Sequence, residues 1–214
     1  MFITLEGCER SGKTTQIELL KNDLTERGCP ALFTREPGDT EIGKKIRAIL
    51  LDPDNKELRA LPELLLYAAD RAQHMEERIF PALKEGKIVV CDRFSDATTV
   101  YQGYVRGVDL SLIEKVHEFI LKGLKPDLTI LFDIDPEVGL RRTRDALMDG
   151  ERSSRESRFE NERLDFHKRV RKAYLDLAEK EKHRFIVIDA AQDVHSIREC
   201  IRKIFREKVY TTCK

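Results

Sequence analysis

One short segment near the N-terminus constrains this chain more than any other feature of its sequence. Gly7-Cys8-Glu9-Arg10-Ser11-Gly12-Lys13-Thr14 matches the pattern G-x-x-x-x-G-K-[ST] in full, after an apolar stretch over residues 2–6 and before a helical stretch that runs to Leu24. A glycine-rich turn between a strand and a helix directs backbone N–H groups and the helix N-terminus at one anion. The alternative interpretation is a glycine-rich turn that only caps a helix.

The segment therefore predicts a site for the polyphosphate of ATP. We expect Lys13 to reach the β- and γ-phosphates and the Thr14 hydroxyl to bind Mg²⁺. The loop alone does not separate a kinase from a GTPase or an ATPase. The residues expected to bind ATP are Gly7, Cys8, Glu9, Arg10, Ser11, Gly12, Lys13, Thr14 and Thr15.

Strand-like and helix-like segments alternate along the rest of the chain. Short apolar runs are expected as strands over 2–6, 31–34, 87–91, 127–133 and 184–189, and helices over 61–83, 113–121, 136–147, 163–182 and 194–207. Apolar strands separated by helices predict a parallel sheet covered on both faces. The expected fold is α/β, a doubly wound five-stranded parallel sheet flanked by helices, in a single domain over 1–214.

Composition narrows the class of protein. Lys plus Arg and Asp plus Glu each number 39, so no overall charge attracts nucleic acid or a membrane surface. No apolar run approaches the ~20 residues of a membrane-spanning helix, and residues 1–6 carry no basic leader. The five cysteines are odd in number, widely spaced and free of any C-x-x-C pattern, which predicts free thiols in a reducing compartment. We expect a cytoplasmic protein.

A second set of residues has the chemistry to bind a second anion. Asp92 and Arg93 directly follow the strand over 87–91, at the sheet edge where ligands bind in this fold class. Asp92 could hold Mg²⁺ or orient an acceptor phosphate, which Arg93 could clamp; the alternative is a surface ion pair. Tyr67 and Arg71 share one helix face, which suits a stacked nucleobase beside a phosphate anchor. On spacing alone a core aromatic with a solvated arginine explains that pair better, and Arg35 belongs to a plain turn.

Arginines concentrate late in the chain, both just before and within a polar segment that we expect to form a lid over about 145–160. Solvated helix faces are one alternative, and interleaved acidic residues argue against a nucleic-acid surface. A lid arginine such as Arg158 could stabilise charge on a transferring phosphoryl group. The arginines of this region are Arg141, Arg142, Arg144, Arg152, Arg155 and Arg158.

Several of these motifs together resemble the thymidylate kinase family along nearly the whole chain. The resemblance covers the phosphate loop, 35–38 (Arg-Glu-Pro-Gly), 64–74, 92–95 (Asp-Arg-Phe-Ser) continuing to 101–103, and 133–140. It implies a homodimeric enzyme that makes dTDP from dTMP. The phosphate loop adds ATP and Mg²⁺, and the balanced charge predicts no nucleic-acid or membrane partner.

The resemblance also implies residue roles. Tyr67 matches the aromatic residue that stacks on thymine, Arg71 and Thr98 match contacts to the base, and Gln102 matches a residue that faces the sugar or base. Tyr101 matches the tyrosine beneath the deoxyribose 2′ position. Acceptor-phosphate contacts are implied for Arg35 and Arg93, and a place near the 3′-hydroxyl and that phosphate is implied for Glu9.

The chain departs from the family pattern at several positions. Gly38-Asp39 replaces the usual Gly-Gly, and Tyr67 replaces the usual Phe and so adds a hydroxyl. An arginine of the phosphate loop serves some members and lid arginines serve others, whereas this chain has both Arg10 and Arg158. The expected catalytic residues are Lys13, Arg10, Glu9, Asp92 and Arg158.

Two other functions stay open on the sequence. The first is a kinase for another (deoxy)nucleotide or a deoxynucleoside. The second is a GTPase-like switch, which predicts an N-K-x-D segment after the fourth strand, where the chain has Asp133-Ile134-Asp135-Pro136. Phosphorylation of dTMP is the leading interpretation.

Overall fold

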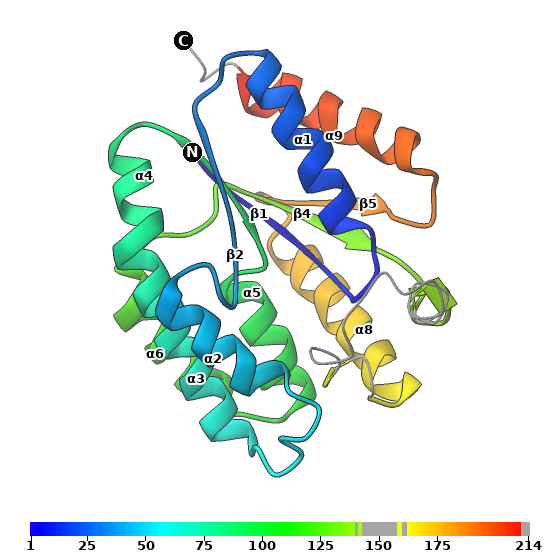
Figure 1. Ribbon diagram of the computed structural model, residues 1–214. Helices are drawn as coiled ribbons and strands as arrows, with labels where there is room; N and C mark the ends of the chain where they lie inside the picture. The colour runs from blue at the N-terminus through cyan, green and yellow to red at the C-terminus, as the bar shows by residue number, and fades with distance from the viewer. Residues whose placement is uncertain (140, 143–157, 160–161, 211–214) are drawn as a thin grey trace.

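The computed structural model describes residues 1–139, 141–142, 158–159 and 162–210. Its centre is a five-stranded parallel sheet in the order β2-β3-β1-β4-β5, with β1 in the middle (Figure 1). Every residue of β1 is buried, which explains why this strand reads as an uninterrupted apolar run. The predicted fold class is confirmed. The strands are β1 (Phe2–Gly7), β2 (Ala31–Arg35), β3 (Ile88–Asp92), β4 (Leu128–Asp133) and β5 (Phe185–Asp189).

Helices cover both faces of the sheet. The helices α1 and α9 lie side by side on one face, while α8 and the group from α2 to α6 lie on the other (Figure 1). The α-helices are α1 (Lys13–Glu26), α2 (Glu41–Leu51), α3 (Ala60–His74), α4 (Phe80–Lys84), α5 (Ser95–Thr98), α6 (Leu110–Leu121), α8 (Leu164–Lys180) and α9 (Val194–Lys208). Two π-helical segments, η1 (Met75–Ile79) and η2 (Thr99–Val105), adjoin α3, α4 and α5.

Several expected boundaries need correction. The helix expected over 61–83 is divided, because η1 separates α3 from α4 and turns Met75 and Ile79, both 0% exposed, into the core. The helix α2 was not expected; it begins where the Thr40 side chain accepts a hydrogen bond from the Gly43 N–H. The helix expected over 136–147 is present at 136–139 and 141–142, and its remaining residues lie outside the described part of the chain.

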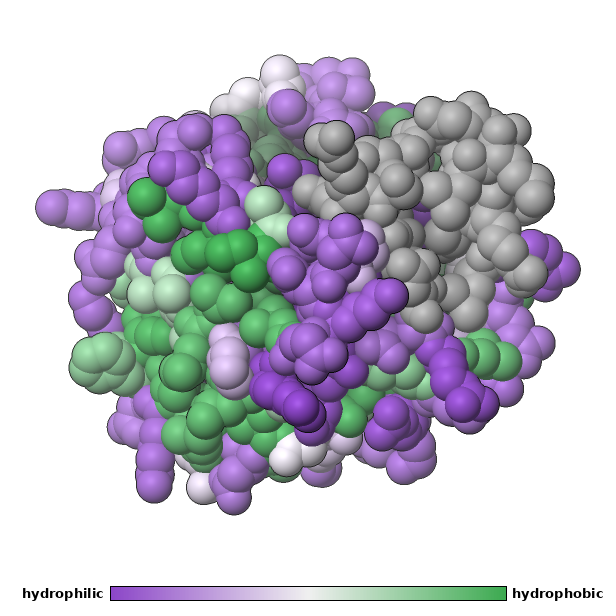
Figure 2. Space-filling model, turned by 60° about the horizontal axis from the view of Figure 1, so that its bottom comes forward, coloured by the Kyte–Doolittle hydropathy of each residue, from purple (hydrophilic) through white to green (hydrophobic). Residues whose placement is uncertain are grey.

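Large apolar side chains gather on one outer face. Figure 2 shows a hydrophobic area on the side of the molecule that carries α2, α3 and α6. Among the described helices, none has the length and apolar character needed to cross a bilayer. The apolar face is formed by side chains of α2, α3 and α6. Its exposed members are Ile42, Ile49, Leu61, Leu65, Leu112 and Phe119.

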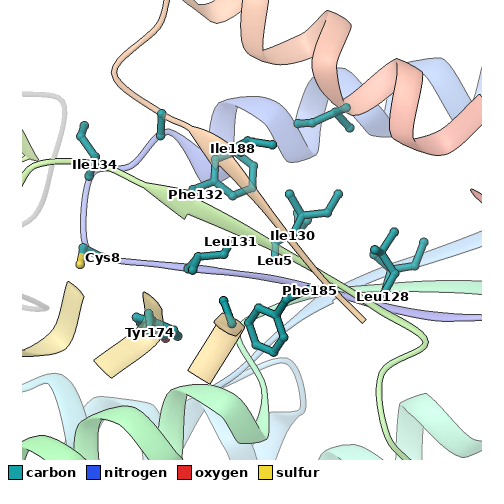
Figure 3. Close-up of a cluster of buried hydrophobic side chains, with 14 of the residues drawn as sticks. Leu5, Cys8, Leu128, Ile130, Leu131, Phe132, Ile134, Tyr174, Phe185 and Ile188 are labelled. Carbon is teal, nitrogen blue, oxygen red and sulfur yellow. The ribbon is translucent and has the colours of Figure 1, made fainter. Parts of the chain in front are cut away.

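The main core lies on both sides of β1, β4 and β5. Neighbouring residues of a strand alternate between the two faces, so Phe132 packs toward α9 with Ile188 (Figure 3). Tyr174 of α8 lies on the opposite side of the sheet (Figure 3). Its hydroxyl reaches Glu6 near the carboxyl end of β1, at the edge where the functional site is found.

Candidate functional site

The conformation of the phosphate loop depends on two glycines with positive φ. A Cβ on Gly7 would lie 2.5 Å from the Phe132 carbonyl oxygen of the neighbouring strand β4, so the close approach of loop and sheet requires glycine. Gly12 has φ 89° and immediately precedes α1, whose N-terminus therefore faces the loop. The Lys13 ammonium donates to the carbonyl oxygens of Gly7 and Cys8 at 3.1 Å each. Burial and the nearby Arg93 lower the pKa of Lys13.

A cleft of about 930 Å³ connects this loop with the carboxyl ends of β2 and β3. Its lining brings together residues from seven separate stretches of the predicted site. Gly7, Cys8 and Arg158 are the predicted site residues that do not line it. Those that do are Glu9, Arg10, Ser11, Gly12, Lys13, Thr14, Thr15, Arg35, Tyr67, Arg71, Asp92, Arg93, Thr98, Tyr101 and Gln102.

A compact network occupies the floor of the cleft. Arg93 Nη2 donates to Glu9 Oε1 at 3.1 Å, and Tyr101 Oη donates to the same oxygen at 2.7 Å. Burial alone would raise the pKa of Glu9, but Arg93, the neighbouring His167 and the hydrogen bond from Tyr101 outweigh it and hold the pKa far below its ordinary value. Glu9 is therefore an anion at neutral pH, paired with the arginine that faces the cleft.

Arg71 is fixed deep in the opposite wall. Its Nε donates to Glu36 Oε2 at 2.8 Å and its Nη2 donates to Thr98 Oγ1 at 3.0 Å, while its side chain is almost fully buried. His117 Nε2 lies 3.2 Å from Arg71 Nη1. Burial and Arg71 lower the pKa of His117 to about 3, so the neutral ring accepts from the guanidinium. The interpretation of Arg71 as a solvated surface arginine is wrong.

Two further predicted residues border this wall. Tyr67 is half-buried, and burial together with Glu63 raises the pKa of its hydroxyl, which stays protonated. Gln102 Nε2 donates to Glu63 Oε1 at 2.8 Å, which fixes the orientation of its amide. Since that bond uses an amide hydrogen, the amide oxygen of Gln102 is left as an acceptor for a ligand.

The residues predicted to hold Mg²⁺ fit the ion. Asp92 Oδ1 is buried without a hydrogen-bond partner among the described residues, and Thr14 lines the same cleft with a hydroxyl. Carboxylate and hydroxyl oxygens suit Mg²⁺, which is commonly held by one carboxylate, water and substrate phosphates. Within the described residues, no group of three or more His, Cys, Asp or Glu side chains forms a metal cage. The donor set thus suits an ion that arrives with a nucleotide.

The two candidate arginines for the transferring phosphate differ in their surroundings. Arg10 has φ 57°, lines the cleft, and buries Nε and Nη2 without partners in the described part of the chain. Arg158 donates from Nη1 to the Leu50 carbonyl at 2.9 Å and from Nη2 to Glu63. Of the expected lid over 145–160, the described residues are 158–159 alone.

Sequence reasoning missed several residues of the site. Arg47 lines the cleft from α2, and its Nη1 donates to the Pro37 carbonyl at 2.8 Å. Arg47 could have been assigned to the site only if the helix α2 had been predicted. Glu36, which anchors Arg71, lay within a predicted motif but received no role. His167 of α8 is buried with Nδ1 3.5 Å from Glu9 Oε2, a contact between residues far apart in the chain.

Comparison with known proteins agrees with this geometry. The family model described as thymidylate kinase matches residues 5–201. The chain belongs to the thymidylate kinase family. A thymidylate kinase of Desulforapulum autotrophicum is 63% identical over 190 residues, which cover 89% of this chain and 84% of that protein. A thymidylate kinase of Desulfosudis oleivorans is 54% identical over 190 residues, 89% of each chain.

Solved structures point the same way. The crystal structure of thymidylate kinase from Ehrlichia chaffeensis superposes with a TM-score of 0.76 at 34% identity, over 96% of this chain and 98% of that one. The resemblance inferred from the motifs is therefore confirmed. Thymidylate kinases are phosphotransferases, so the chain is an enzyme of that class.

Proposed function

We propose that the chain transfers the γ-phosphoryl group of ATP to dTMP and so makes dTDP for the supply of dTTP. One observation carries this proposal: a single cleft joins the phosphate loop to a second cationic end formed by Arg93 and Arg35. A hydrolase of nucleoside triphosphates needs only the first end. The second end, with Tyr67 and Arg71 beside it, suits a nucleotide that carries one phosphate.

The mechanism follows from the charges at the two ends. The loop N–H groups, the α1 N-terminus and Lys13 would hold the β- and γ-phosphates, while Arg93 and Arg35 would hold the acceptor phosphate in line. The acceptor oxygen is already ionised near neutral pH, so no strong general base is required. Glu9 would orient Arg93 and the sugar 3′-hydroxyl.

Mg²⁺ would be held by Thr14, Asp92 and the phosphates of ATP. When bound, the ion neutralises charge that develops on the β- and γ-oxygens. We propose Arg10 as the residue that stabilises the transferring group, since two of its guanidinium nitrogens are buried in the cleft region without partners among the described residues. Arg158 remains a candidate on the resemblance alone.

Base recognition rests on the wall that holds Arg71. Tyr67 would stack on thymine, and Arg71, Thr98 and Gln102 would contact its polar edge. Tyr101 would lie beneath the sugar, where a 2′-hydroxyl would have to displace the phenol that bonds to Glu9. This arrangement predicts a preference for deoxyribonucleotides.

A panel of acceptors tests the proposed function. ADP formation from ATP would be measured with dTMP, dUMP, dCMP, AMP and thymidine. We expect dTMP to be the best acceptor and thymidine, which lacks the phosphate, to give no turnover above background. Equal or faster turnover of AMP would contradict the substrate assignment, and ATP or GTP hydrolysis without acceptor phosphorylation would contradict the kinase.

We further propose a homodimer that covers the apolar face of α2, α3 and α6. Leu65 is 54% and Phe119 84% exposed on this face, and an apolar area of this kind is typical of protein interfaces. Light scattering should give a dimer mass for the native chain and a monomer mass for Leu65→Glu/Phe119→Lys. A monomeric native chain at micromolar concentration would overturn the proposal.

A cytoplasmic location completes the proposal. The described cysteines Cys8, Cys29, Cys91 and Cys200 are free thiols, as a reducing compartment favours. Nucleotide and Mg²⁺ are expected as small-molecule partners, without nucleic acid or a membrane.

A further inference from the structure

Arg93 lies in the turn after β3, where its backbone conformation is unfavourable. Its φ is 65°, a left-handed conformation that costs free energy for a residue with a side chain. Two hydrogen bonds from the turn to β1 hold it. Arg93 N–H donates to the Leu5 carbonyl at 3.0 Å, and Phe94 N–H donates to Glu6 Oε1 at 2.8 Å. The carboxylate of Glu6 therefore fixes the backbone on which Arg93 is presented.

The other oxygen of Glu6 fixes the side chain. Tyr174 Oη donates to Glu6 Oε2 at 2.7 Å, and Arg93 Nη1 donates to Tyr174 Oη at 3.3 Å. A guanidinium can only donate, so the Tyr174 oxygen accepts from Arg93 and the Tyr174 hydrogen goes to Glu6. Burial and Glu6 raise the pKa of Tyr174 well above its ordinary value, so the phenol stays protonated. Glu6 thus supports Arg93 at both its backbone and its guanidinium.

The hydrogen bonds of Arg93 leave two of its N–H donors for a ligand. One N–H of Nη1 goes to Tyr174, the other to Tyr101 at 3.3 Å, and one N–H of Nη2 goes to Glu9. A guanidinium has five N–H donors, so Nε–H and one Nη2–H have no partner in the described part of the chain. The two tyrosines and Glu9 therefore orient the group and leave two donors, which matches the two oxygens of a phosphate.

Neither Glu6 nor Tyr174 can touch a ligand. Glu6 is 0% and Tyr174 1% exposed, and neither lines the cleft. A buried carboxylate and phenol are also costly to desolvate, and an apolar pair would fill this space in the core without that cost. What they do for the site must act through Arg93.

We propose that Glu6 and Tyr174 are positioning residues that set the orientation of Arg93 for the acceptor phosphate. This inference rests on the proposed function, in which Arg93 binds that phosphate. The pair acts from the sheet and from α8, whereas Glu9 and Tyr101 act from the cleft side.

Tyr174→Phe tests the proposal by removing only the hydroxyl. Titration calorimetry would compare the binding of dTMP with that of thymidine, which lacks the phosphate. We expect dTMP to bind roughly tenfold more weakly, as loss of a hydrogen bond to a charged group implies, with thymidine binding and KM for ATP changed less than about twofold. Tyr104→Phe is the matched control, because among the described residues its hydroxyl accepts from Lys180 alone, at the exposed end of α8.

A double-mutant cycle separates this inference from the proposed function. In an Arg93→Lys background, Tyr174→Phe should have no additional effect on dTMP binding, since its target is gone. If Arg93→Lys itself leaves dTMP binding intact, the assigned role of Arg93 is wrong. If Arg93→Lys weakens dTMP binding but Tyr174→Phe does not, or weakens thymidine equally, the positioning role is wrong.

Glu6→Gln keeps the proposal testable should Tyr174→Phe fail to fold. At pH 8, above the pKa of about 7 of Glu6, the amide oxygen of the variant can accept only one of the two bonds that the carboxylate accepts, so the phosphate-specific loss should recur. Unchanged dTMP binding in a folded Glu6→Gln protein would overturn the positioning role.

Discussion

At the scale of single residues, the site depends on side chains whose partners are distant in sequence. Arg71 is recognisable as a candidate from its spacing to Tyr67, yet the same spacing fits an exposed arginine. Its partner Glu36 lies 35 residues away in the chain and Thr98 lies 27 away, so the sequence carries no local sign of the pairing. These partners fix the buried Arg71 side chain in the wall of the cleft.

Thr98→Val tests the proposed role of Thr98, which supports Arg71 and also faces the base. The change keeps the shape of the side chain and removes the oxygen that accepts from Arg71 Nη2. We expect KM for dTMP to rise roughly tenfold with KM for ATP unchanged. Thr99→Val is the control, since its hydroxyl donates to the Ser95 carbonyl and does not line the cleft. Equal effects of the two variants would contradict the role of Thr98.

The raised pKa of Glu6 leads to a second prediction, on the pH dependence of the free energy of unfolding. Burial, with Asp96 nearby, raises the pKa of Glu6 from 4.5 to about 7. Between these values the folded protein binds more protons at Glu6 than the unfolded chain, so its contribution to stability falls as the pH rises. Glu6→Gln lacks this contribution.

Urea denaturation measures the effect. We expect the free energy of unfolding of the native chain, relative to Glu6→Gln, to fall by on the order of 2 kcal/mol between about pH 5 and about pH 8. A difference that does not change with pH would show that Glu6 titrates as in the unfolded chain, and one that grows with pH would show that folding lowers its pKa; either result would contradict the prediction.

At the scale of elements, strong local patterns were predictable and irregular ones were not. The phosphate loop and the strands were found because glycine spacing and apolar runs are read within a few residues. The helix α2 escaped because its cap, Thr40, follows a turn of charged and glycine residues that reads as loop. Without α2, Arg47 could not be assigned to the cleft.

The cap of α2 can be tested directly. Thr40→Ala removes the acceptor for the Gly43 N–H, and we expect the free energy of unfolding to fall by about 1 kcal/mol. Thr40→Ser keeps the oxygen and should lose only a fraction of that. Chemical denaturation of both variants gives the comparison, and an equal loss in each would show that the methyl group matters more than the cap.

At the scale of the whole molecule, topology explains why distant motifs form one site. With β1 at the centre and β3 beside it, the loop after one strand and the turn after the other must open at the same edge. The parallel sheet was predictable from the alternation of segments, and so was the meeting of the Gly7–Thr14 loop with Asp92 and Arg93. The buried layer of Glu6, Tyr174 and His167 was not, because such residues within a strand or an amphipathic helix look like ordinary core or surface positions.

The most direct test of the account compares ADP formation from ATP, with dTMP as acceptor, between the native chain and Lys13→Ala. The account predicts acceptor-dependent ADP formation by the native chain and a loss of at least ~10²-fold in the variant, because a preorganised charge at the transferring phosphate is removed. Native protein that forms no ADP in response to dTMP, or a variant that retains its rate, would contradict the claim that one cleft holds both phosphates for transfer.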